Sequence, residues 1–186
     1  MRYCLLRMVT ANENHNKDYE MEQLTDTQFV IRYGRYGAAK QEKIYSLSMW
    51  EKLYAKKIRK GYKDITDYVN IAVKKTKTAG YKPIADEGIR QLIDTLLSYA
   101  NDYVKTVYSI SKRKVTPQML IAAQKKIDQL WDFSQTQFVD RFNSALQDLL
   151  VIIPQRISNV DSILAKDANS MSSIVDAQQT RLDTLA

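Results

Sequence analysis

The chain has 186 residues, of which 45% are hydrophobic, and a formal net charge of +7. This composition excludes wholesale disorder, and the length allows one ordinary domain or two small ones. The basic excess favours a polyanionic partner, either a nucleic acid or an anionic membrane surface. Cys4 is the single cysteine, which excludes a disulfide framework and a cysteine-ligated zinc site.

The N-terminus is too short and too often interrupted by arginine to be a signal peptide. No run in the sequence approaches the roughly 20 apolar residues of a membrane span. We therefore expect a soluble, intracellular protein that does not associate with a membrane.

Alternating segments in the first part of the chain predict a small antiparallel sheet. The expected strands are residues 1–10, 19–24, 28–32 and 42–47. We expect a polar loop over 11–18 and a turn at Tyr33-Gly34-Arg35. Ser48 precedes Glu51 with the spacing of a capping box, which predicts a helix that runs to about Arg59 and ends at Gly61.

The second part of the chain reads as helical. Residues 71–83 are rich in lysine, without an apolar period, and are expected to be a linker. Apolar residues between Ile89 and Ala100 follow helical spacing and predict a buried stripe, with a short second helix expected over 101–109. Thr116-Pro117 predicts another helix start.

Further apolar stripes along residues 120–131, 138–150 and 163–185 complete four or five amphipathic helices, which predict a bundle. The fold class is therefore α+β, a small antiparallel sheet with one helix followed by an all-helical bundle. The expected domains are residues 1–70 and 84–186, joined by the basic linker 71–83.

Residues 32–37, Arg-Tyr-Gly-Arg-Tyr-Gly, hold the most informative side chains. Gly34 and Gly37 permit close backbone approach, and the arginines and tyrosines can bind phosphates and stack on sugars or bases. The functional interpretation is a nucleic-acid contact surface, and the alternative is a tight hairpin with ordinary surface arginines. The lysine-rich end of the helix near Arg59 adds positive charge, although cations there also suit the helix dipole.

The sequence offers no catalytic constellation. His15 is the only histidine and lies in the expected polar loop. We find no paired carboxylates in a plausible cleft, no metal-ligand cluster and no phosphate-cradling glycine loop. We therefore expect that this chain is not an enzyme by itself and needs no cofactor and no metal.

The order of these parts resembles the WGR domain followed by the helical regulatory domain of poly(ADP-ribose) polymerases, without the transferase domain. The polar segment 14–19, the Tyr33-Gly34-Arg35-Tyr36-Gly37 turn and the Lys60-Gly61-Tyr62 helix end are similar to WGR features. Tyr33 stands where the family has tryptophan. In the helical half, residues 116–123 and 142–154 are similar to a helix start and a helix end of the regulatory domain.

The resemblance implies that the first domain binds the end or nick of broken DNA and that the bundle regulates a transferase domain or subunit. Tyr33 would stack on the terminal nucleotide, Arg35 would bridge DNA and the helical domain, and Asn16 and Lys17 would contact phosphates. The other expected nucleic-acid-binding residues are Gly34, Tyr36, Lys40, Lys43, Tyr62 and Lys63. The location would then be the nucleus or the nucleoid.

Two alternatives remain. The chain could be a protein-interaction adaptor whose helical bundle docks a separate enzyme. It could also be a generic binder of single-stranded DNA or RNA, because the tyrosine and arginine side chains permit that as well.

Overall fold

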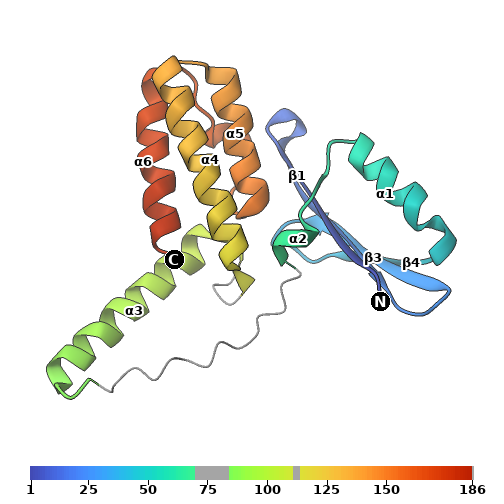
Figure 1. Ribbon diagram of the computed structural model, residues 1–186, viewed down its shortest axis with the longest axis horizontal. Helices are drawn as coiled ribbons and strands as arrows, with labels where there is room; N and C mark the ends of the chain where they lie inside the picture. The colour runs from blue at the N-terminus through green and yellow to red at the C-terminus, as the bar shows by residue number, and fades with distance from the viewer. Residues whose placement is uncertain (70–83, 111–113, 186) are drawn as a thin grey trace.

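The computed structural model describes residues 1–69, 84–110 and 114–185, so the whole of the expected linker 71–83 lies outside the described residues. The chain has an α+β fold with a five-stranded antiparallel sheet, in the order β4-β3-β2-β1-β5, followed by helices (Figure 1). The strands are β1 (Tyr3–Thr10), β2 (His15–Gln23), β3 (Gln28–Arg35), β4 (Gln41–Ser46) and β5 (Lys63–Asp64). Short helices η1 (Asn12–Asn14) and α2 (Thr66–Val69) follow β1 and β5 respectively.

Alternation along β1 gives the sheet two buried faces. Cys4 and Leu6 lie in one apolar cluster with Trp50 of helix α1 (Trp50–Arg59). Leu5 and Val9 point to the other face and pack against residues of helix α5 (Val139–Ile152). Side chains alternate between the two faces of a strand, so β1 contacts α1 on one face and the helical half on the other. Figure 1 shows this arrangement.

Strand β2 begins at His15, so the expectation of a loop over residues 11–18 is wrong for its second half. Asn16 and Asp18 are buried, and Asp18 forms an ion pair with Arg7 of β1. A buried polar residue interrupts the apolar alternation from which a strand is predicted. Asp18 can be buried here because the strand register places it opposite Arg7, and the sequence pattern does not show that register.

The turn after β3 also lies later than expected. Tyr33, Gly34 and Arg35 are within the strand and pair with β2, while Gly37 has the left-handed φ of +79°. Gly34 is needed for close approach, because a Cβ there would lie 3.3 Å from the backbone oxygen of Ala39. The sharp change of direction therefore occurs at Gly37.

Helix α1 ends where it was expected to end but begins differently. Gly61 has a φ of +86°, and its N–H donates to Ile58 O at 2.9 Å, which confirms its role as the stop. The prediction of a capping box at Ser48 is wrong, because a short η2 turn (Leu47–Met49) precedes α1 and no side chain caps the helix. Ser48 Oγ instead lies 2.9 Å from Ser46 Oγ.

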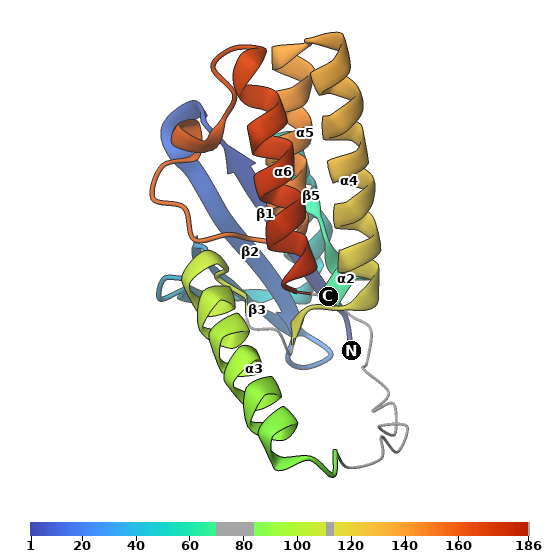
Figure 2. The same ribbon diagram turned by 90° about the vertical axis from the view of Figure 1, so that its left-hand side faces the viewer.

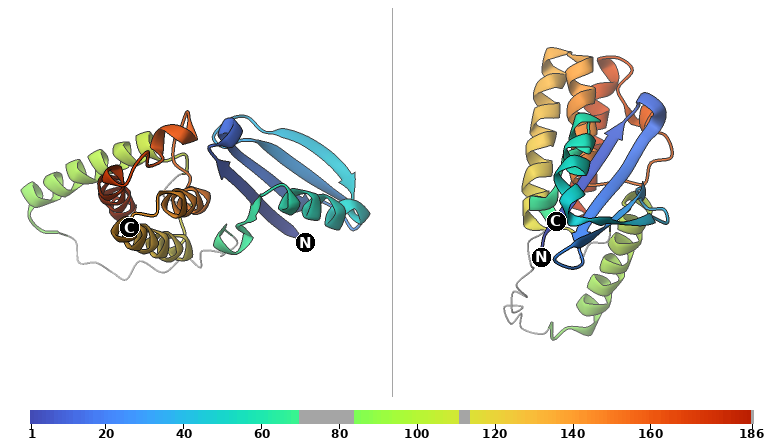
Figure 3. Two further views of the ribbon diagram at one scale, coloured as in Figure 1. Left: turned by 90° about the horizontal axis from the view of Figure 1, so that it is seen from above. Right: turned by 90° about the vertical axis from the view of Figure 1, so that its right-hand side faces the viewer.

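The helical half contains α3 (Glu87–Val107), α4 (Pro117–Thr136), α5, the η4 turn (Val160–Ile163) and α6 (Asn169–Asp183). Seen from above, α4, α5 and α6 stand end-on as a group (Figure 3). The Thr116 cap is confirmed, since Met119 N donates to Thr116 Oγ1 at 3.2 Å. The bundle core includes Met119, Ala123, Ile127, Leu130, Phe142, Leu146, Leu149, Met171 and Val175.

Helix α3 differs from both expectations for residues 84–109. It is one continuous helix through residue 107, and its apolar stripe faces solvent rather than a core. The helix leaves the bundle at an angle, so that only its last turns reach the core, where Val104 is buried (Figure 2). The large exposed apolar side chains are Ile89, Leu92, Ile93, Leu96, Leu97, Tyr99 and Tyr103.

We expect Leu96→Ala to change the free energy of unfolding by less than about 0.5 kcal/mol, because Leu96 is 57% exposed. The matched change Leu130→Ala, at a fully buried site of α4, should cost about 2–5 kcal/mol. Urea unfolding followed by far-UV circular dichroism measures both. A large loss for Leu96→Ala would mean that the stripe of α3 is buried in solution.

The sheet and the bundle share a buried cluster. Leu5, Val9 and Ile65 of the first half contact Leu150, Val151 and Val160 of the second. In the part of the chain that the structure describes, no helix has both the length and the apolar character to cross a membrane.

Candidate nucleic-acid interface

A groove lies between α1 and the sheet face that α1 covers. It has a volume of about 220 Å³, and we call it the lysine–tyrosine groove. Among the described residues, its lining contains four lysines and three tyrosines and no carboxylate. The lining residues are Tyr19, Ile31, Tyr33, Lys43, Tyr45, Leu53, Lys56, Lys57 and Lys60.

The strand register and the helix together assemble this groove. Tyr19 and Tyr33 are direct partners in the β2–β3 ladder, and their ring centroids are 6.2 Å apart. Lys57 lies on α1 with its Nζ 4.1 Å from the centroid of Tyr19 and 4.8 Å from that of Tyr62. Lys43 Nζ lies 6.0 Å from the centroid of Tyr33. Cation–π contacts of this kind hold the ammonium groups beside the aromatic faces.

The groove has an unfavourable excess of positive charge. Burial lowers the pKa of Lys57, and repulsion from Lys60, Lys17 and Lys56 lowers it further. Burial also raises the pKa of Tyr19 to about 12, so this tyrosine stays neutral. A phosphate placed here would relieve the repulsion between lysines, which is the electrostatic condition for binding a polyanion.

Only some of the expected binding residues belong to this groove. Tyr33 and Lys43 line it, and Lys17 is near enough to affect the pKa of Lys57. Asn16 and Tyr62 are only 4% and 8% exposed, so their side chains are not placed for the expected direct contact with a nucleic acid. The Tyr62 ring instead contacts Lys57, and the Asn16 backbone oxygen accepts from Tyr36 N at 2.9 Å.

Three other expected residues face the junction between sheet and bundle. The guanidinium of Arg7 lies 4.4 Å from the ring of Tyr36. Lys40 Nζ donates to Glu20 Oε2 at 3.1 Å, and Lys63 pairs with Asp148 of α5. Lys40 is thus paired with a carboxylate, and Lys63 shares Asp148 with Lys126. Tyr36, Lys40 and Lys63 do not line the lysine–tyrosine groove.

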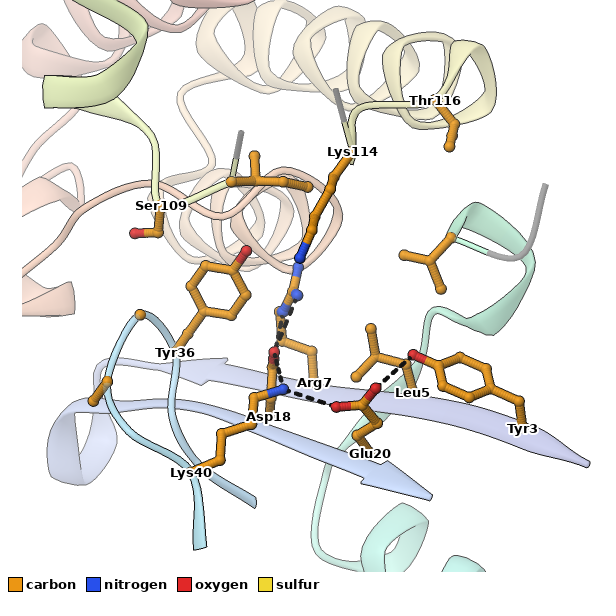
Figure 4. Close-up of a pocket in the computed structure, with 14 residues that line it drawn as sticks. Tyr3, Leu5, Arg7, Asp18, Glu20, Tyr36, Lys40, Ser109, Lys114 and Thr116 are labelled. Atoms are coloured by element: carbon orange, nitrogen blue, oxygen red, sulfur yellow. Dashed lines mark hydrogen bonds and ion pairs between the residues drawn. The ribbon is translucent and has the colours of Figure 1, made fainter. Parts of the chain in front are cut away.

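Tyr36 and Lys40 line a cavity of about 630 Å³ between the sheet and the bundle (Figure 4). Arg7 and Asp18 form its floor, with Arg7 Nε 2.7 Å from Asp18 Oδ1. Arg7 Nη1 also donates to Val151 O at 2.9 Å, which ties the sheet to α5. Tyr3 donates to Glu20, and burial raises the pKa of Tyr3 strongly.

Arg35 joins the two halves of the chain. Its Nη1 donates to Asn14 O at 3.1 Å, and its Nη2 donates to Ser158 O at 2.9 Å and to Ile157 O at 3.3 Å. Asn14 strengthens the same junction, because its Oδ1 accepts from Val160 N at 2.9 Å. The half-buried guanidinium therefore lies at the boundary between β3 and the segment that follows α5. Gly34 precedes it in the strand and takes part in the close approach to Ala39.

Local sequence patterns did not place Tyr19 and Tyr45 in the interface, and they marked Lys56, Lys57 and Lys60 only as a basic helix end. A signal for the tyrosines existed, because alternation puts Tyr19 and Tyr33 on one face if the two strands pair as observed. The position of the lysines depended on how α1 packs on the sheet, which local patterns do not specify.

No family model matches this chain. The chain is similar to uncharacterized protein 101L of Invertebrate iridescent virus 6, with 29% identity over 184 residues. The match covers 99% of this chain and 76% of the viral protein. It extends over both the sheet and the helical half, so the likeness concerns the combination of the two.

Proposed function

We propose that the lysine–tyrosine groove binds the phosphate backbone of DNA at strand breaks. The observation that supports this proposal is the gathering of four lysines and three tyrosines without a carboxylate in the lining. Lysines attract phosphates without reading sequence, and tyrosine rings stack on exposed bases or sugars. A nick or an end offers both a phosphate and an unstacked base, whereas an intact duplex offers the phosphates alone.

We further propose that the chain is the break-binding and regulatory module of a poly(ADP-ribose) polymerase-like ADP-ribosyltransferase system, and is not catalytic by itself. The resemblance of the sequence to the WGR and regulatory domains supports this part. The contacts of Arg35 with Ile157 and Ser158 also support it, since they give the DNA-binding half a direct connection to the bundle. A transferase domain or subunit would be the partner of the bundle.

Fluorescence anisotropy with nicked, blunt and single-stranded DNA over a series of salt concentrations tests the proposal. We expect salt-sensitive binding, a preference for the nicked or blunt duplex, and little dependence on sequence. Arg35→Ala should weaken binding to the nicked duplex, because the resemblance to the WGR domain implies that Arg35 bridges DNA and the helical domain. Equal affinity of this variant and the wild type would remove Arg35 from the interface. A preference for the single strand would instead favour a generic single-strand binder.

Lys57→Gln should weaken binding to the nicked duplex and lower the slope of log K against log salt by about one. The reason is that Lys57 lies in the groove between two tyrosine rings. Lys52→Gln is the matched control, because Lys52 is an exposed lysine of the same helix that does not line the groove. If both variants lose affinity equally, the binding reflects net charge and not this groove.

The affinity of the wild type should also decrease with rising pH in a range below the ordinary lysine pKa of 10.5, because the pKa of Lys57 is lowered. Above that lowered pKa the free protein has lost the charge, and binding must then take up a proton. Lys57→Arg keeps its charge, since arginine is not deprotonated in proteins, and should remove this part of the pH dependence. Anisotropy titrations at constant ionic strength provide the measurement.

A second candidate function is a protein-interaction adaptor, which the exposed apolar stripe of α3 favours. This candidate predicts a stoichiometric protein partner and no DNA binding at moderate salt. A pull-down combined with the anisotropy series separates the two functions.

A further inference from the structure

A second groove without carboxylates lies on the helical half, between the end of α3, the segment after α5, and α6. It has a volume of about 260 Å³, and we call it the arginine groove. Among the residues that the structure places, none of its lining side chains is acidic. The lining residues are Thr106, Val107, Gln155, Arg156, Ile157, Ser158, Ser162, Ile163 and Arg181.

Buried amides fix the position of Arg181. Its Nη1 donates to Gln155 Oε1 at 2.7 Å, and Gln155 Nε2 donates to Gln178 Oε1 at 2.5 Å. Gln155 and Gln178 are each only 4% exposed. Two buried polar side chains therefore orient one guanidinium at the groove, and most of its N–H groups remain available for a ligand.

Backbone oxygens at the end of α3 fix the position of Arg156. Its Nε donates to Lys105 O at 2.7 Å and to Tyr108 O at 3.1 Å, and its backbone N–H donates to Val107 O at 2.8 Å. Capping the end of α3 explains the Nε contacts, but the Nη groups form no hydrogen bond with any residue that the structure describes. Within the described part of the chain, neither Arg156 nor Arg181 forms an ion pair with a carboxylate.

We propose that the arginine groove is a binding site for a phosphate group. Two guanidiniums that line one groove supply more donors than the two oxygens of a carboxylate can use, whereas a phosphate or pyrophosphate can accept from both arginines. The volume of about 260 Å³ is below the range of about 300–1,000 Å³ usual for sites of whole drug-sized ligands. The groove therefore suits the phosphate part of a ligand and not a nucleobase.

The position of this site links it to the junction of the two halves. Ser158 lines the groove, and its backbone oxygen accepts from Arg35 of β3. A bound phosphate would hold the end of α3, residues 155–163 and α6 together, and so stiffen the segment that Arg35 contacts. The phosphate could come from a small molecule or from a nucleic acid, and the proposal does not depend on the function of the lysine–tyrosine groove.

The test is isothermal titration of the full chain with inorganic pyrophosphate. We expect saturable binding to the wild type, and a loss of about tenfold or more in affinity for both Arg156→Gln and Arg181→Gln. Arg141→Gln is the matched control, since it removes an exposed arginine from the same half outside the groove, and it should bind like the wild type. Far-UV circular dichroism confirms that each variant is folded.

Two results would overturn the proposal. One is the absence of pyrophosphate binding to the wild type, which does not depend on any variant being folded. The other is binding that survives both arginine changes but is lost in Lys57→Gln, which would assign the ligand to the lysine–tyrosine groove.

Repeating the titration with saturating nicked duplex identifies the source of the phosphate. Unchanged pyrophosphate binding assigns the groove to a small phosphorylated molecule. Competition that persists in Lys57→Gln assigns it to a nucleic-acid phosphate. Either result upholds the phosphate site, and neither requires that the lysine–tyrosine groove binds DNA.

Discussion

Arg7→Met is expected to lower the free energy of unfolding by about 3–5 kcal/mol. Arg7 and Asp18 are each 2% exposed, and the variant leaves the Asp18 carboxylate buried without its main partner. Lys40 Nζ, 3.7 Å from Asp18 Oδ2, is too far for a good hydrogen bond. The variant also removes the donor to Val151 O, so part of the loss comes from the contact between sheet and bundle.

Urea unfolding measures this change, and Arg32→Met is the control. Arg32 forms ion pairs with Glu22 and Glu42 near the sheet surface, where we expect a loss of no more than about 1 kcal/mol. The double variant Arg7→Met/Asp18→Leu should recover most of the lost stability, since removing both charges leaves no unpaired one. Equal losses for Arg7→Met and Arg32→Met would contradict the burial of the Arg7–Asp18 pair.

Leu150→Ala is expected to cost about 2–5 kcal/mol and to destabilise the sheet and the bundle together. Leu150 is 1% exposed and lies in the cluster that α5 shares with β1, where Leu5 and Val9 are its partners from the sheet. Shortening this side chain leaves a cavity between the two halves. The structure therefore predicts that a substitution in the bundle lowers the stability of the sheet.

Two probes can follow the two halves separately. Trp50 is buried against the sheet, while Trp131 is 51% exposed on α4, so a Trp131→Phe background leaves Trp50 as the fluorescent reporter of the sheet. Circular dichroism reports mainly on the helices. Both signals should show one common transition that Leu150→Ala moves to lower urea. A shift of the dichroism midpoint without a shift of the Trp50 signal would show that the halves unfold independently.

Local sequence patterns determined most of the secondary structure of this protein. The alternation in residues 1–10 and 28–32 specified strands with two distinct faces, because a strand repeats every two residues. Thr116-Pro117 and Gly61 specified a helix start and a helix end, since capping and left-handed backbone depend on the residue itself. The α+β order of sheet and bundle followed from these local signals.

Tertiary packing decided where those elements place their side chains. The stripe of α3 has helical spacing, but the angle at which α3 leaves the bundle exposes it. The local sequence around Asp18 predicts a loop, but in the structure Asp18 lies within β2 and pairs with Arg7 of β1. The lysine–tyrosine groove required the register Tyr19↔Tyr33 and the packing of α1 on the sheet, which bring residues 19, 33 and 57 together. A sequence pattern reports the periodicity of a face, whereas the contacts of that face depend on elements far away in the chain.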